Sequence, residues 1–331
     1  MSARLATRLT DRLGLVHPIL GAPMAFAAGG RLAAAVTRAG GLGLIGGAYG
    51  DDDWLETAFR DAGNASVGCG FITWNLARMG ARGEALLEAT LARRPRVLLL
   101  SFGDPEPFAR TVLEAGSMLA VQVQRVEDAR RALDCGADVI VAQGGEAGGH
   151  GEKRATMTLV PELVDLVCAR APDTLVLAAG GIADGRGLAA SLALGADGVL
   201  VGSRLWASRE AQVHPALQDA ALAADGDATL RTRVVDIARH LPWPDRYTAR
   251  VLANDFTGRW HGREDALCER ADSESRRWRA ALEAGDARTA NAFVGEAAGL
   301  IHSVEPVEQI LETMVREAVE RLRAITARTD V

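Results

Sequence analysis

The chain has 331 residues, of which 48% are hydrophobic and 24% charged, a balance typical of soluble globular proteins with one large domain and room for an insertion. The net charge of -6 and the single lysine, Lys153, give no basic stripe, so nucleic acid is not an expected partner. The four cysteines form no CxxC pair, and no uncharged apolar stretch reaches membrane-spanning length, so we expect a protein of the reducing cytoplasm without a zinc site, a disulfide framework or a membrane anchor.

Short apolar runs alternate with helical patterns along the first two thirds of the chain. Such alternation with short connections predicts a (β/α)8 TIM barrel rather than an open doubly wound sheet. The expected strands are 15–24, 42–45, 66–73, 96–101, 117–122, 138–143, 174–179 and 198–201.

The pattern changes after Trp206. From His214 to about Leu300 no strand pattern is evident, and arginine, alanine and scattered aromatic residues indicate helices. The final helix, expected from Pro306 to Ala327, has apolar residues at helical spacing and is expected to complete the barrel. We therefore predict a barrel made of residues 1–206 and 302–331, with 207–301 as a mainly helical insertion over its mouth.

Glycine-rich loops follow three of the expected strands. Five glycines follow the strand 138–143 within eight residues, and glycine pairs or a glycine-serine pair follow the last two strands. Loops after the last two strands of such barrels commonly bind phosphate through main-chain N–H groups. The residues expected to do so here are Gly180, Gly181, Gly202 and Ser203.

Polar side chains near the expected strand ends suit a heteroaromatic ligand. Gln143 and Asn75 each offer an amide donor and acceptor, which can match the edge of a flavin. His150, in the glycine-rich loop, is placed to take a proton from a substrate carbon, because imidazole titrates near neutrality. Glu146 is a second acid/base, a solvated loop residue, or a partner of Arg154.

One apparent dinucleotide motif is rejected. Gly41, Gly43 and Gly46 spell GxGxxG, but they follow a helix and frame a strand, whereas the fingerprint needs a strand before it and a helix inside it.

Several of these motifs together resemble one family. The segment QGGEAGGHG at 143–151, with AAGGIADGRG and LVGSR downstream, resembles the nitronate monooxygenases, which are FMN-dependent barrels with a helical insertion. The opening PILGAPM at 18–24 and the late GEAAGLI at 295–301 are similar to the ends of that family, so the likeness covers nearly the whole chain.

The resemblance implies an FMN enzyme that oxidises a small nitronate with O2 to a carbonyl compound and nitrite. It implies His150 as the general base or substrate-orienting residue. The FMN contacts that it implies are Ala22, Pro23, Met24, Asn75, Gln143, Gly148, Gly180, Gly181, Gly202 and Ser203.

Other functions stay open at this stage. The same fold can reduce a quinone or an enoyl thioester with NAD(P)H, and a barrel that has lost catalysis can bind a metabolite or a protein partner. Members of the family that oxidise nitronates carry pocket tyrosines and a lysine, whereas this chain has only Tyr49, Tyr247 and Lys153. The chain is compatible with a homo-oligomer, but its sequence specifies no oligomeric state.

Overall fold

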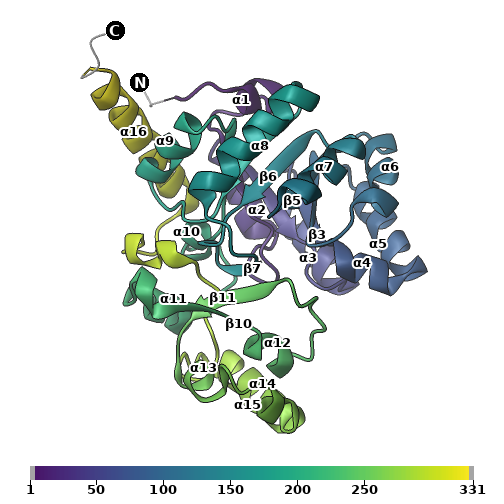
Figure 1. The fold of residues 1–331 in the computed structure, drawn as a ribbon, viewed down its shortest axis with the longest axis vertical. Coiled ribbons are helices and arrows are strands. Elements are labelled where there is room, and N and C mark those ends of the chain that lie inside the picture. Colours follow the sequence, from purple (N-terminus) through teal and green to yellow (C-terminus); the bar gives the residue numbers. More distant parts are fainter. Residues whose placement is uncertain (1–3, 328–331) are drawn as a thin grey trace.

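A closed barrel of parallel strands forms the centre of the molecule. The computed structural model describes residues 4–327. The strands pair in the order β1-β2-β3-β4-β5-β6-β8-β9, and β1 pairs with β9 to close the barrel (Figure 1). Their bounds are β1 (Ile19–Gly21), β2 (Leu42–Gly46), β3 (Gly68–Ile72), β4 (Val97–Ser101), β5 (Met118–Val123), β6 (Val139–Gln143), β8 (Leu175–Ala179) and β9 (Gly198–Val201). The predicted TIM barrel is confirmed.

The strands are buried on both faces, which explains their nearly continuous apolar sequences. In β4, Leu98 and Leu100 pack toward the surrounding helices, whereas Val97 and Leu99 belong to a separate cluster inside the barrel. This inner cluster also contains Leu9, from the short helix α1 (Arg8–Leu13).

Helices cover the outside of the barrel. They are α2 (Gly30–Arg38), α3 (Asp52–Ala62), α4 (Thr73–Met79), α5 (Ala81–Leu91), α6 (Glu106–Glu114), α7 (Val126–Asp134), α8 (Thr156–Arg170), α9 (Gly185–Ala193) and α16 (Val307–Thr326). The last of these packs against both α9 and α2, so the C-terminal helix returns to the barrel as predicted. The rejected glycine motif frames β2, also as predicted: a side chain at Gly43 would collide with the backbone of Ala33 in α2.

The prediction that the stretch from His214 to Leu300 contains no strand is wrong. Strands β10 (Thr229–Thr232) and β11 (Thr248–Leu252) form an antiparallel sheet with β7 (Gly149–Gly151), in the order β10-β11-β7. Both insertion strands are short, with four and five residues, and carry an arginine, Arg231 or Arg250, in mid-strand, which weakens the strand pattern. Their partner β7 lies in the glycine-rich loop, so the pairing is invisible locally.

The insertion has its own hydrophobic core. Trp206, Val235, Phe256, Trp260 and Trp278 belong to a cluster separate from the two barrel clusters. In Figure 1 this part lies at the end of the barrel opposite α1. The short helix α10 (Ser203–Trp206) leads from β9 into the insertion, whose further elements are α11 (Pro215–Leu222), η1 (Gly226–Ala228), α12 (Val234–Ala238), α13 (Asp255–Trp260), α14 (Glu264–Cys268), α15 (Ala271–Ala284) and η2 (Glu296–Leu300).

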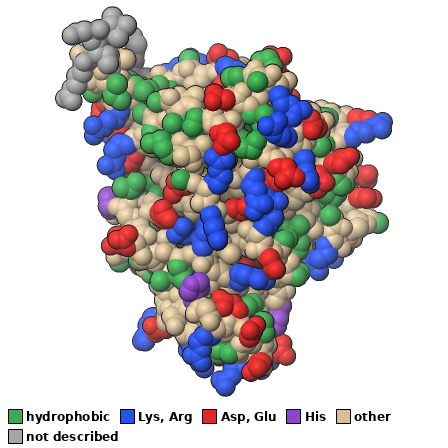
Figure 2. All heavy atoms as spheres, viewed as in Figure 1, with side chains coloured by type: hydrophobic (Ala, Val, Ile, Leu, Met, Phe, Trp, Pro, Cys, Tyr) green, Lys and Arg blue, Asp and Glu red, His purple; other side chains and the backbone are tan. Residues whose placement is uncertain are grey.

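The surface mixes charges of both signs. Figure 2 shows basic and acidic side chains intermingled over the visible face. In the part of the chain that the structure describes, no helix is long and apolar enough to cross a bilayer. Within 4–327 there is also no group of three or more histidine, cysteine, aspartate or glutamate side chains suited to a metal ion.

The contact between α9 and α16 provides a stability test. A Cβ on Gly185 would lie 2.3 Å from the Glu317 Cβ and 2.4 Å from the Ala318 backbone nitrogen. We expect Gly185→Ala to lower the free energy of unfolding by about 1–3 kcal/mol, because α16 must move away from α9. Urea denaturation measures this loss.

Gly258→Ala is the matched control. Gly258 lies inside α13, and an added Cβ there meets nothing within 4 Å. This change should leave stability unchanged or raise it by up to about 1 kcal/mol, because alanine favours the helix. Equal destabilisation by both changes would contradict the packing argument.

Candidate active site

A cavity of about 840 Å³ opens where the carboxyl ends of the barrel strands meet the insertion. The barrel contributes loop residues to its lining, and the insertion contributes Leu217, Arg239, Trp243 and Phe293. Of the predicted site residues, the structure brings together Ala22, Pro23, Met24, Gln143, Gly148, His150, Gly180, Gly181, Gly202 and Ser203 around this cavity.

Asn75 is the predicted site residue that does not line the cavity. Strand β3 ends at Ile72 and the chain enters α4 at once, so Asn75 lies within a helix and not at a strand end as expected. Its Nδ2 donates to the Tyr49 carbonyl at 2.9 Å, and its Oδ1 accepts from Arg78 at 3.2 Å. The amide thus holds the loop that carries Tyr49.

The amide at the end of β6 has a partner that the sequence did not suggest. Gln143 Oε1 accepts a hydrogen bond of 2.7 Å from Gln124 Nε2. Gln122, on the neighbouring strand β5, lines the cavity, and its buried Nε2 has no hydrogen-bond partner among the residues that the structure describes. Since buried donors are normally satisfied, this amide is suited to an acceptor atom on a bound ligand. The alternation Gln122-Val123-Gln124 at the strand end was the signal available in the sequence.

The glycine loops leave main-chain donors and open space. Gly180 and Gly181 have φ of +101° and +74°, a region that favours glycine. Within the described chain, the N–H groups of Gly180, Gly181 and Gly202 donate to no protein group. A Cβ on Gly202 would come no closer than 3.8 Å to any atom outside its chain neighbours, so a ligand can approach its backbone. Such a cradle fits a phosphate.

His150 forms a buried pair with an aspartate of the insertion. It lies in β7, where it is the register partner of Ala249 in β11. Its Nε2 lies 2.9 and 3.0 Å from the two carboxylate oxygens of Asp236 in α12. The Trp243 ring stacks on the imidazole with a centroid distance of 3.4 Å and an interplanar angle of 5°. This contact fixes both the plane and the direction of the imidazole.

Burial lowers the pKa of His150 below its ordinary value of 6.5, outweighing the opposite effect of the Asp236 carboxylate. The imidazole is therefore neutral at pH 7. With Nε2–H donating to Asp236, Nδ1 carries the free lone pair, and it has no hydrogen-bond partner within 4–327. A neutral histidine oriented by a carboxylate is suited to accept a proton.

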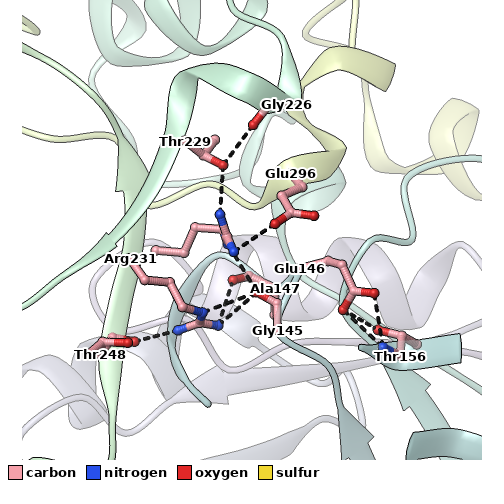
Figure 3. A network of polar contacts seen from close by, with 10 residues as sticks. Gly145, Glu146, Ala147, Thr156, Gly226, Thr229, Arg231, Thr248 and Glu296 are labelled. Carbon is pink, nitrogen blue, oxygen red and sulfur yellow. Dashed lines mark hydrogen bonds and ion pairs between the residues drawn. The ribbon is translucent and has the colours of Figure 1, made fainter. Parts of the chain in front are cut away.

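Two arginines of the insertion hold the glycine-rich loop (Figure 3). Arg231 donates to the Gly145 carbonyl at 3.2 and 3.0 Å, and Arg250 donates to the same carbonyl at 3.0 Å. Arg250 also pairs with Glu296 at 2.7 Å. Burial lowers the pKa of Arg231 to about 10. The Arg231 guanidinium stays charged at pH 7, and the two arginines bind the insertion strands to the loop that carries His150.

The suggested pairing of Glu146 with Arg154 is wrong. The Glu146 carboxylate accepts from the Thr156 backbone N–H at 3.0 Å and from its hydroxyl at 2.8 Å, at the start of α8 (Figure 3). Arg154 instead pairs with Glu162 at 2.6 Å. The carboxylate thus links the glycine-rich loop to the first turn of α8 and satisfies one of its free backbone donors.

The decisive comparison is with a family profile described as nitronate monooxygenase, which matches residues 6–67 and 73–317. The chain belongs to the nitronate monooxygenase family. Members of this family are oxidoreductases that depend on a flavin, and the structure agrees with their TIM-barrel fold.

Individual relatives carry different functional names. The chain is 30% identical over 350 residues to a nitronate monooxygenase of Neurospora crassa, covering 93% of this chain and 91% of that protein. It is 33% identical over 237 residues to an octahydro-indene-carboxyl-CoA dehydrogenase of Mycobacterium tuberculosis, covering 72% of this chain and 66% of that protein. A solved structure of FabK from Thermotoga maritima superposes with a TM-score of 0.85 at 32% identity, over 98% of this chain and 100% of that one.

The side chains that the insertion supplies to this site were not predicted from the sequence. Asp236 and Trp243 lie far from His150 in the sequence, and no motif spacing connects them. Trp243 is one of the scattered aromatic residues of the insertion, which by themselves indicated only helices. Arg239, which also lines the cavity, gave no sequence signal, and Tyr49 stands out in the sequence only as one of the chain's two tyrosines.

The His150–Asp236 pair can be tested by a single change. We expect Asp236→Asn to lower kcat by about 10²-fold or more, because the amide no longer fixes the tautomer with a lone pair on Nδ1. Steady-state kinetics with nitronates and nitroalkanes would measure this. The exposed Asp245→Asn is the control and should leave kcat within about twofold. A normal kcat for Asp236→Asn would show that the carboxylate does not orient the base.

The lowered pKa of His150 also predicts a pH dependence of stability. Below pH 6.5 the unfolded chain binds a proton at this histidine while the folded chain does not, so the free energy of unfolding falls as pH falls from 6.5 toward the lowered value. His17 acts in the same direction because burial lowers its pKa too. His150→Asn should therefore weaken this dependence without removing it, as measured by urea unfolding between about pH 7.5 and pH 5.5. If the free energy of unfolding of His150→Asn depended on pH as steeply as that of the original protein, the lowered pKa of His150 would be contradicted.

Proposed function

We propose that this protein is an FMN-dependent oxidoreductase that oxidises alkyl nitronates with O2 to a carbonyl compound and nitrite. The observation that carries the proposal is the oriented, neutral His150 in the same cavity as the free main-chain donors of the last two barrel loops. The family match and the relative named nitronate monooxygenase support it.

The residues present fit FMN. Gly180, Gly181, Gly202 and Ser203 would hold the phosphate through main-chain N–H groups. Gln122 and Gln143 would meet the polar edge of the ring, and Ala22, Pro23, Met24 and Gly148 would contact its apolar parts. When bound, the flavin accepts electrons from the substrate and passes them to O2.

The chain's own groups bind the substrate and handle its proton. His150 accepts a proton from the carbon of a neutral nitroalkane at Nδ1, or orients a nitronate that has already lost it. Asp236 holds the imidazole and stabilises the charge that it gains. Phe102 and Trp243, both on the cavity wall, exclude water from the imidazole. Residues 207–301 serve as the cover that supplies Asp236 and Trp243.

A second candidate function keeps FMN and changes the electron donor. The relative named as a carboxyl-CoA dehydrogenase favours a thioester or a related acyl compound as substrate, with NAD(P)H or a quinone as redox partner. Anaerobic stopped-flow mixing separates the two functions. Rapid bleaching of the flavin by a nitronate supports the first, whereas bleaching by NADH or NADPH alone supports the second.

Binding of FMN can be tested before any turnover is measured. The purified protein should be yellow, or should take up added FMN, and should release FMN on denaturation. A colourless protein that does not bind FMN would remove both candidate functions.

His150→Asn provides the main catalytic test. We expect kcat with a neutral nitroalkane to fall by about 10²–10⁴-fold, because proton removal loses its base. The preformed nitronate should be affected less, since it needs no proton removal. FMN content, measured by absorbance, should stay unchanged. Full activity on the nitroalkane would show that His150 is not the base.

A further inference from the structure

A closed ring of contacts connects His150 to four other side chains at the cavity. Asp236 bonds the imidazole and lies 3.9 Å from Arg239 Nη1. Arg239 Nη2 donates to the Tyr49 hydroxyl at 2.9 Å, and Trp243 Nε1 donates to the same oxygen at 3.2 Å. The stacking of Trp243 on His150 closes the ring. The function proposed above uses His150, Asp236 and Trp243 but leaves Tyr49 and Arg239 without a role.

The Tyr49 hydroxyl is arranged to donate its proton to a ligand. It already accepts two N–H donors, which occupy its oxygen lone pairs. Burial raises the pKa of Tyr49 above 10, so the proton is present at any pH near neutrality. Tyr49 donates to no acceptor within the described residues, and its side chain lines the cavity.

Arg239 has N–H donors that remain available to a ligand. Its nearest carboxylate is that of Asp236, at 3.9 Å from Nη1, and within 4–327 its only hydrogen bond to another side chain is the one from Nη2 to Tyr49. The guanidinium lies over the rings of Tyr49 and Phe293, at 5.2 and 5.1 Å from their centroids. Its side chain is only 16% exposed, so its charge is poorly screened by water.

The cavity as a whole favours a negatively charged ligand. Its described lining includes Arg239 and Arg279 but no aspartate or glutamate. The nitronate group is planar and carries its negative charge on two oxygens. A hydroxyl and a guanidinium side by side can donate to both oxygens, as charge-assisted hydrogen bonds.

We propose that the Tyr49 hydroxyl and the Arg239 guanidinium bind the anionic oxygen atoms of the substrate beside His150. This assignment rests on the proposed function, because it names the residues that select the anionic substrate at the same site. Trp243 is a positioning residue, since it holds the Tyr49 oxygen and the imidazole in one arrangement. The same two groups can also donate hydrogen bonds to other planar oxyanions, including the product nitrite.

The experiment measures nitrite binding to FMN-saturated enzyme. Nitrite is the probe because it carries the O–N–O group of the nitronate. Binding is followed by the change in flavin absorbance, and nitrite is also tested as a competitive inhibitor of nitronate turnover. We expect Tyr49→Phe to weaken nitrite binding by about 10-fold or more, because a hydrogen bond to a charged group is lost. Arg239→Gln should weaken it further, and Arg239→Lys should restore part of the affinity.

Tyr247→Phe is the matched control. Tyr247 is the other tyrosine of the chain, it does not line this cavity, and its hydroxyl makes no hydrogen bond within the described residues. This change should leave nitrite affinity within about twofold. FMN content and the melting temperature of each variant verify that the fold is intact.

The outcomes separate the two proposals. Loss of nitrite affinity with a raised KM for nitronate supports both. Tyr49-dependent nitrite binding in an enzyme that oxidises no nitronate keeps the anion site and rejects the proposed function. If Tyr49→Phe and Arg239→Gln both oxidise nitronate normally and bind nitrite with unchanged affinity, the anion site is overturned. The proposed function then still stands. Should Arg239→Gln fail to fold, Tyr49→Phe decides alone.

Discussion

The active site depends on the pairing of β7 with β11. Three residues in a glycine-rich loop cannot hold a fixed conformation alone, because glycine loses more backbone entropy on ordering than any other residue. The antiparallel register of His150 with Ala249, and the two arginines on the Gly145 carbonyl, provide the necessary contacts. The imidazole is therefore positioned by the insertion as much as by the barrel.

Burial sets the electrostatics of this region. Removing His150 from water favours its neutral form, and the carboxylate of Asp236 then orients the ring without protonating it at pH 7. Asp236 also lies near Arg239, so the base and the cation share one buried carboxylate. A change at any of these groups leaves a buried polar atom without its partner, which is costly. The proposed proton acceptor and the proposed anion site are consequently one coupled unit.

The two halves of the cavity provide different chemical groups. The barrel loops provide main-chain donors and close backbone approach, which suit a phosphate and an aromatic ring whatever the substrate. The insertion provides Asp236, Arg239 and Trp243, which contact or orient His150 and Tyr49. A shared barrel alone does not specify a reaction. The chain is similar both to a protein named for nitronates and to one named for a CoA compound. This is consistent with a shared barrel half and an insertion half that differs between relatives.

The barrel and one half of its site could be derived from the sequence, because they follow from local patterns. Apolar runs such as 139–142 are buried on both faces, and glycines after Ala179 and Val201 place backbone donors at one end of the barrel. The spacing of apolar residues in α16 was sufficient to return it to the barrel. The tertiary structure alone decided three features: the sheet β10-β11-β7, the helical position of Asn75, and the contacts of Asp236 with His150. These features join segments that local propensity does not connect, and they form only when the insertion folds back over the strand ends and excludes water from the groups between them.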